Sequence, residues 1–217
     1  DVAEKGVGKT YLIEHSAGSG KSNSLTWLAF KLRKVCPNSM DAVRAKAIDA
    51  PLYNSVIVVT DRRLLDKQIT DNIKAFGQSD KIVAHADSSK DLKDAIENNK
   101  RIIITTIQKF PFICDAISDV SDHNFAIIID EAHHAISGSY QVILDHFSDA
   151  HVLGVTATPD RGDKQNLGKV FDSLAYEYTL PQAIHEGYLT PIRALTVPVQ
   201  IDFTHVGTAA GDYKPVD

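Results

Sequence analysis

The stretch Thr10-Tyr11-Leu12-Ile13-Glu14-His15-Ser16-Ala17-Gly18-Ser19-Gly20-Lys21-Ser22 decides the fold of this chain. It begins with the apolar residues of a buried strand, passes through a glycine-containing loop, and ends in a lysine and a hydroxyl side chain. Leucine and alanine then recur at helical spacing, so a helix is expected over residues 22–34. A loop between a strand and a helix N-terminus can wrap backbone N–H groups around phosphates. The stretch therefore predicts a nucleoside triphosphate site.

A second Gly-Lys-Thr sequence lies just upstream, in Ala3-Glu4-Lys5-Gly6-Val7-Gly8-Lys9-Thr10. As a string it fits a phosphate loop well, but a strand-like segment follows it where a helix is needed, and almost nothing precedes it. The helix N-terminus matters because it carries partial positive charge. Context therefore favours Lys21 over Lys9, and residues 6–10 are interpreted as a flexible entry turn.

Each residue of the favoured loop has an expected role. Gly18, Ser19 and Gly20 leave the backbone free to approach the phosphates. Lys21 supplies a positive charge to the β and γ oxygens, and Ser22 offers a hydroxyl to Mg²⁺. A nucleoside triphosphate and Mg²⁺ are therefore the expected ligands of this loop.

A second motif suits the same nucleotide site. It is the sequence Ile127-Ile128-Ile129-Asp130-Glu131, an apolar strand that ends in two acids. Asp130 is expected to hold Mg²⁺, usually through water. Glu131 is expected to orient or deprotonate the attacking water. Lys21, Asp130 and Glu131 are thus the candidate catalytic residues. The alternative is that the two acids are solvated or cap the following helix.

Apolar segments alternate along the chain between strand-like and helix-like patterns. Near-continuous Ile/Val strands indicate a parallel sheet covered on both faces, so the expected fold is doubly wound α/β. Ligands of such sheets gather at the carboxyl ends of the strands, where all of these motifs fall. Strands are expected over residues 54–59, 81–84, 101–105, 125–130 and 151–156, with a further one over 195–203, and helices over 62–76, 91–98 and 139–147.

Composition sets wider bounds. The chain has 217 residues, of which 43% are hydrophobic, and no run approaches the ~20 apolar residues of a membrane span. Its net charge of -5 argues against a uniformly basic coat for nucleic acid. Cys36 and Cys114 match no metal spacing, which favours idle thiols in a reducing cytoplasm. His133 and His134 are adjacent and lack a nearby third ligand, so a metal site is not expected there.

Three motifs resemble those of a known family. Ala17-Gly18-Ser19-Gly20-Lys21-Ser22, Asp130-Glu131-Ala132-His133 and Thr156-Ala157-Thr158-Pro159 resemble motifs I, II and III of the DEAH-box helicases of superfamily two. Residues 11–24, 56–68 and 105–110 resemble, more narrowly, the motor subunit of type I restriction enzymes. The resemblance implies a RecA-like P-loop NTPase domain that hydrolyses ATP to move along duplex DNA.

The resemblance also implies roles for other side chains. His133, Thr156 and Thr158 match positions that couple the nucleotide site to the nucleic-acid site, although capping of the next helix is the alternative for the threonines. Segments 59–63 and 105–109 match motifs that touch the DNA backbone, which suits hydroxyl and cationic side chains. Taken one at a time, each arginine or lysine side chain of these segments could equally be a solvated residue at the start of a helix. The candidate DNA contacts are Thr60, Arg62, Arg63, Thr105, Thr106 and Lys109.

The expected organisation is an ATPase domain over residues 1–180, followed over 181–217 by a connector or the start of a second domain. The segment from Tyr176 onward resembles other superfamily-two helicases more than the restriction motor. The resemblance implies methylation and specificity subunits as partners, and a larger parent protein of which this is the first motor domain. A repair or remodelling helicase, or a nucleotide-dependent DNA-binding module without turnover, are the alternatives.

Overall fold

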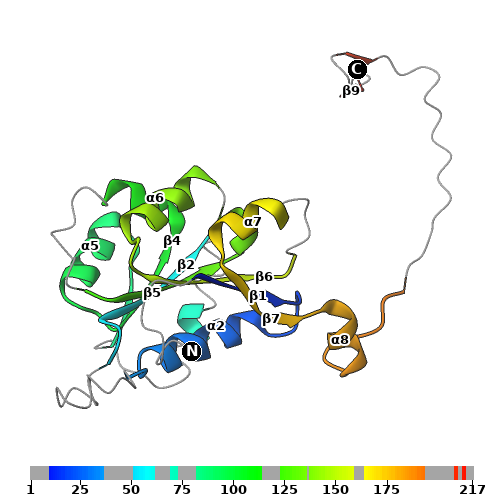
Figure 1. Cartoon of the computed structure of the whole chain (residues 1–217), viewed down its shortest axis with the longest axis horizontal. Coiled ribbons are helices and arrows are strands. Elements are labelled where there is room, and N and C mark those ends of the chain that lie inside the picture. The colour runs from blue at the N-terminus through cyan, green and yellow to red at the C-terminus, as the bar shows by residue number, and fades with distance from the viewer. Residues whose placement is uncertain are drawn as a thin grey trace.

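One parallel β-sheet organises the chain, as seen in a computed structural model (Figure 1). The structure describes residues 10–36, 51–61, 69–72, 82–113, 123–135, 137–158, 164–193, 208–209 and 212–213. The seven strands of this sheet run parallel in the order β3-β4-β2-β5-β6-β1-β7. Their bounds are β1 Thr10–His15, β2 Ser55–Thr60, β3 Val83–His85, β4 Ile102–Thr106, β5 Phe125–Asp130, β6 His151–Thr156 and β7 Ser173–Tyr178. Two short strands, β8 (Thr208–Ala209) and β9 (Asp212–Tyr213), pair antiparallel with each other.

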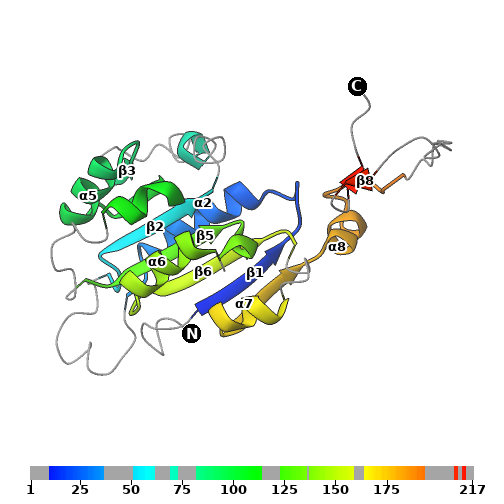
Figure 2. The same ribbon diagram turned by 90° about the horizontal axis from the view of Figure 1, so that it is seen from above.

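Helices cover both faces of the sheet. Helix α2 (Lys21–Leu32) lies on one face, whereas α5 (Ser89–Glu97), α6 (Gly138–His146) and α7 (Lys164–Val170) lie on the other. Figure 2 views the sheet from the side of these last three helices. The short 3₁₀ helices η1 (Ile107–Phe112) and η2 (Ala132–His134) follow β4 and β5, and α8 (Leu180–His185) extends beyond the β7 edge. None of the described helices is long and apolar enough to cross a membrane.

The central strands are apolar along most of their length because both of their faces are covered. All residues of β2, β4 and β5 are buried. Successive residues of a strand point to opposite faces, so β2 contributes to two cores. Val56 and Val58 belong to the cluster that contains Leu25 of α2. Ile57 and Val59 belong to the cluster that contains residues of α5, α6 and α7.

The predicted doubly wound parallel α/β fold is confirmed. Strands β5 and β6 have the predicted bounds, and β2 and β4 are displaced by one residue. Helices α5 and α6 begin and end slightly earlier than predicted. Only residues 69–72 of the predicted helix 62–76 are described, and they are helical. The strand predicted over 195–203 lies outside the described residues.

Strand β7 was not predicted, nor were helices α7 and α8. All residues of β7 but the last are exposed, because it pairs only with β1 at the edge of the sheet. An exposed edge strand has no buried face to leave an apolar pattern in the sequence. The β7 strand nevertheless matters for the site, because its last residue, Tyr178, accepts a hydrogen bond from the backbone N–H of Ser16 at 2.9 Å.

Candidate nucleotide-binding site

The loop predicted to bind phosphate joins the end of β1 to the start of α2, as expected from the sequence. Gly18 and Gly20 have φ angles of 77° and 96°, in the left-handed region that favours glycine. Helix α2 begins at Lys21, and no side chain among the described residues caps its N-terminus. Ser22 lies half-buried in its first turn. An uncapped helix start that faces a glycine loop is suited to an anion.

The alternative phosphate loop over residues 6–10 has a different setting. Lys9 lies outside the described residues, but Thr10 is already the first residue of β1. A strand, not a helix, therefore follows Lys9. Thr10 also bonds to Asp172, since its backbone N–H and its hydroxyl both donate to Asp172 Oδ2 at 2.9 Å. These contacts use Thr10 to join the start of β1 to the residue before β7.

The lysine of the loop meets the two acids at the end of β5. Strand β6 lies between β1 and β5 in the sheet, so the contact spans one strand. The ammonium of Lys21 is 3.0 Å from Asp130 Oδ1 and 2.5 Å from Glu131 Oε1. The structure thus brings together the three residues that the sequence predicted to be catalytic.

Asp130 lies in an unusual environment for a charged residue. Its side chain is fully buried, and neither of its oxygens makes a hydrogen bond of normal geometry with the described residues. Burial raises the pKa of Asp130 above its ordinary value, although the ammonium of Lys21 acts in the opposite direction. Mg²⁺ prefers oxygen ligands and retains several waters. The unsatisfied carboxylate of Asp130 and the hydroxyl of Ser22 fit this ion.

The residues predicted to couple the two sites form a chain of contacts. His133 lies in η2, where its Nδ1 is 3.4 Å from Glu131 Oε2 and 3.0 Å from Thr156 Oγ1. Thr156 Oγ1 also accepts a hydrogen bond from the backbone N–H of Thr158 at 3.2 Å. The ends of β5 and β6 are therefore connected through His133. The coupling role itself stays a prediction.

The predicted DNA contacts are less accessible than expected from the sequence. Thr60 and Thr105 are fully buried, and their hydroxyls have no hydrogen-bond partner among the described residues. Thr106 is only 4% exposed, and the ammonium of Lys109 donates to the carbonyl oxygen of Ala86. The hydroxyls of Thr60 and Thr105 therefore do not reach the surface in this arrangement. Arg62 and Arg63 lie outside the described residues, and contact with DNA stays a prediction for the whole set.

A histidine that the sequence analysis did not predict contacts the phosphate loop. His15 Nδ1 lies 2.8 Å from Ser19 Oγ, and His15 Nε2 lies 3.0 Å from Ser24 Oγ in α2. Ser19 Oγ donates its proton to the Ser16 carbonyl at 2.5 Å, so His15 Nδ1 acts as the donor to Ser19. In the sequence, His15 could have been noticed because its ring stands at a position where the phosphate-loop motif usually carries a small residue.

Comparisons with known proteins show the family of the chain. Residues 2–206 match the SWI2/SNF2 ATPase family. The putative ATP-dependent helicase IRC3 of Saccharomyces cerevisiae is 29% identical over 171 residues, which cover 75% of this chain and 23% of that protein. The type I restriction enzyme HindI endonuclease subunit of Haemophilus influenzae is 26% identical over 215 residues, which cover 88% of this chain and 19% of that subunit. The chain thus spans less than a quarter of the length of either relative.

Solved structures share the fold at low identity. The helicase domain of Pyrococcus furiosus Hef has a TM-score of 0.59 and 19% identity, covering 86% of this chain and 38% of that one. A DEAD box protein from Methanococcus jannaschii has a TM-score of 0.54 and 20% identity, covering 78% of this chain and 45% of that one. Because the family match extends over most of the sequence, the chain belongs to the SWI2/SNF2 ATPase family and is a helicase-like ATPase domain of superfamily two.

Proposed function

We propose that this chain is the first motor domain of an ATP-driven translocase that moves along duplex DNA, as in the motor subunit of a type I restriction endonuclease. The observation that carries the proposal is the contact of Lys21 with both Asp130 and Glu131 across β6. It supports the proposal because the lysine proposed to bind phosphate lies beside the acid proposed to bind Mg²⁺ and the acid proposed as the base. In this proposal residues 1–180 are the ATPase domain, and residues 181–217 connect it to a second one.

The proposed chemistry assigns a task to each group. The loop amides of residues 18–20 bind the phosphates, and Lys21 exchanges its two carboxylate partners for phosphate oxygens. Asp130 and Ser22 would hold Mg²⁺, which would neutralise charge on the phosphates. Once Lys21 has turned to the phosphates, Glu131 Oε1 can accept a hydrogen bond from the attacking water. In this proposal, a bound nucleotide replaces the ion pairs that Lys21 makes with Asp130 and Glu131 in the present structure.

The proposed partner is the backbone of duplex DNA. Support comes from the relatives, which are described as a helicase and as restriction endonuclease subunits. The net charge of -5 leaves no general attraction to DNA, so contacts must be local and salt-sensitive. In a restriction complex, the methylation and specificity subunits would be the protein partners, within the cytoplasm.

Hydrolysis of ATP measured with and without duplex DNA tests the proposal. We expect slow turnover by the chain that DNA increases, and loss of turnover in Glu131→Gln with ATP binding retained. Removal of a general base costs about 10²–10⁴ in rate. Parental turnover in Glu131→Gln would show that the acid pair is structural. Equal rates of ATP hydrolysis with and without DNA would contradict the proposal that DNA is the partner.

A repair or remodelling helicase is the second candidate, favoured by the match to IRC3 over 75% of the chain. Translocation along duplex DNA can displace a third strand without separating the duplex, whereas a helicase separates its strands. Assays of third-strand displacement and of duplex separation on one substrate therefore discriminate between the two. A DNA-binding module without turnover would bind DNA in a nucleotide-dependent way and hydrolyse nothing.

A further inference from the structure

A cavity of about 590 Å³ opens beside the phosphate loop, between α2, β7 and the turn after α8. This volume is in the range of pockets that bind small molecules. Its lining includes Ser19, Leu28, Tyr176, Tyr178, Glu186 and Tyr188. Ser19 belongs to the loop that is proposed to hold phosphates, so a bound nucleotide would reach from that loop directly into this cavity.

The order of strands gives the direction in which a nucleotide would lie. Lys21 meets Asp130 and Glu131 on the β5 side of the loop, where the terminal phosphate would be held. On the other side of β1 lies β7, whose end contributes Tyr178 to the cavity. With its terminal phosphate toward β5, the nucleotide has its ribose and base directed toward β7. The cavity occupies that side.

Aromatic side chains form the wall of the cavity. The ring of Tyr178 packs edge-to-face with His15 at 5.9 Å and with Tyr188 at 6.4 Å between centroids. Tyr188 is 70% exposed, so its ring is available to a ligand. Leu189 lies against the phosphate loop, since a Cβ added to Gly18 would be 3.3 Å from Leu189 Cδ2. The segment that carries Tyr188 therefore lies close to the phosphate loop.

We propose that the cavity binds the base of the nucleotide, with the base stacked on Tyr188 and its exocyclic amine donating to Glu186. The proposal rests on the proposed function of the phosphate loop, and it adds the residues that recognise the nucleoside. Base–aromatic stacking is effective for any base, because every base has a π face. Glu186 adds a preference for a base whose edge donates a hydrogen bond.

The carboxylate of Glu186 is held ready for such a donor. Gln182 Nε2 donates to Glu186 Oε1 at 3.0 Å, and Tyr178 Oη donates to Glu186 Oε2 at 2.8 Å. These hydrogen bonds hold the pKa of Glu186 below its ordinary value. Each carboxylate oxygen has two lone pairs, so one on each remains for a ligand. An adenine amine satisfies this requirement.

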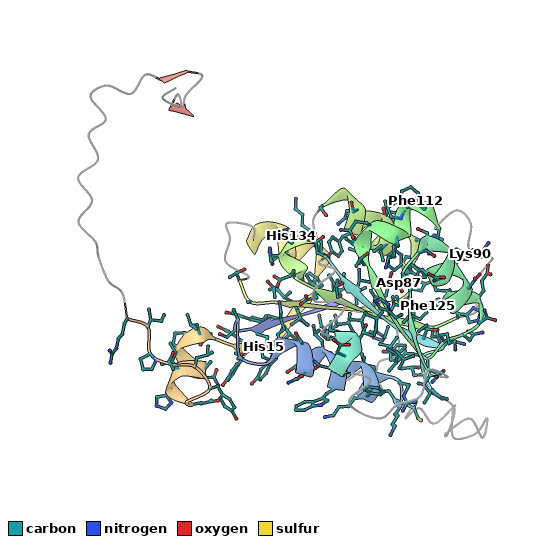
Figure 3. All side chains as sticks on the ribbon, turned by 180° about the vertical axis from the view of Figure 1, so that it is seen from behind. His15, Asp87, Lys90, Phe112, Phe125 and His134 are labelled. Atoms are coloured by element: carbon teal, nitrogen blue, oxygen red, sulfur yellow. The ribbon has the colours of Figure 1, made fainter. Side chains whose placement is uncertain are left out.

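Separate binding measurements for Mg-ATP and for inorganic tripolyphosphate test the proposal, since only the first ligand has a base. Tyr188→Ala in the full chain should weaken ATP about 5- to 100-fold, the equivalent of ~1–3 kcal/mol of stacking, and leave tripolyphosphate within about twofold. Tyr188→Phe should retain the affinity for ATP. Phe112→Ala is the matched control, because Phe112 is 77% exposed and lies on the other face of the sheet (Figure 3).

Glu186→Gln tests recognition of the amine. The parent should bind ATP more tightly than purine riboside triphosphate, which lacks the 6-amino group, and the difference should shrink in Glu186→Gln. Unchanged ATP affinity in Tyr188→Ala would overturn the proposal, and so would an equal loss for ATP and tripolyphosphate. Lys21→Ala should weaken both ligands. If it weakened neither, the proposed function of the phosphate loop would fail, whatever the result at Tyr188.

Discussion

Replacing Asp130 by asparagine should stabilise the nucleotide-free protein while it weakens Mg²⁺-dependent binding. The ammonium of Lys21 is shared between the carboxylates of Asp130 and Glu131. The Asp130 side chain is fully buried and lacks a hydrogen bond of normal geometry among the described residues. Taking a carboxylate out of water costs several kcal/mol, and Asp130→Asn removes this cost while Lys21 keeps Glu131 as its partner. Loss of the attraction to Lys21 offsets part of that gain, which leaves about 1 kcal/mol.

The pH dependence follows from the raised pKa of Asp130 in the folded state. Between the unfolded pKa, near 3.8, and the higher folded pKa, the folded protein binds more protons than the unfolded chain. The parent therefore loses stability as the pH rises through this window. The advantage of Asp130→Asn should be complete above the folded pKa of Asp130. It should disappear below the unfolded value.

Thermal unfolding with and without Mg-ATP measures both effects. A gain of about 1 kcal/mol raises the melting temperature by ~2–4 °C for a chain of this size. Ligand at 100 times its dissociation constant adds about 2.7 kcal/mol to the parent. The variant should therefore melt above the parent without Mg-ATP and below it with Mg-ATP. The exposed Asp145 provides the control, because Asp145→Asn should change stability by less than ~0.5 kcal/mol. An Asp130→Asn variant that is less stable than the parent at neutral pH would refute the reasoning.

Three further predictions concern the same site and its partner. Lys21→Ala should abolish ATP binding and Lys9→Ala should leave it nearly intact, as measured by calorimetry; a loss in the Lys9 variant would overturn the assignment of the loop. His133→Ala removes the contacts of His133 with Glu131 and with Thr156, so it should reduce stimulation of hydrolysis by DNA more than it reduces ATP affinity, and an equal loss of both would indicate a structural role. DNA affinity should fall steeply with salt and be similar for two unrelated duplexes, because backbone contacts carry no sequence information. Strong discrimination between the duplexes would contradict this.

Much of the nucleotide site could be predicted because its signals are local. A strand, a glycine loop and a helix start are contiguous in sequence, and Asp130 directly follows an apolar run. Local patterns do not give the order of strands, so the sequence alone could not show that Lys21 touches Glu131 across β6. The sequence also places Thr60 and Thr105 near strand ends, but their burial depends on the strands and helices that surround them.

The base-binding cavity could not have been predicted from local patterns. Tyr176 and Tyr178 lie on an exposed edge strand, and Trp27 on the outer part of α2 is 56% exposed. In the sequence these residues are typical of ordinary core or surface aromatics, because they are distant from one another and have no common spacing. They line one cavity only because β7 pairs with β1 on the side away from β6. Function at this edge therefore depends on topology more than on motifs.

The ion pairs of Lys21 suggest how a nucleotide could be sensed at the end of β6. Without phosphate, the ammonium of Lys21 holds Glu131 Oε1, and Glu131 Oε2 lies 3.4 Å from His133 Nδ1. When phosphates take over Lys21, Glu131 Oε1 loses its contact with the ammonium, so the carboxylate can change its position relative to His133. His133 is also 3.0 Å from Thr156 Oγ1, so a movement of the Glu131 carboxylate changes the surroundings of this contact as well. We therefore expect the NMR signals of the His133 ring to shift when Mg-ATP binds. Unchanged signals of the His133 ring on saturation with Mg-ATP would exclude this link between β5 and β6.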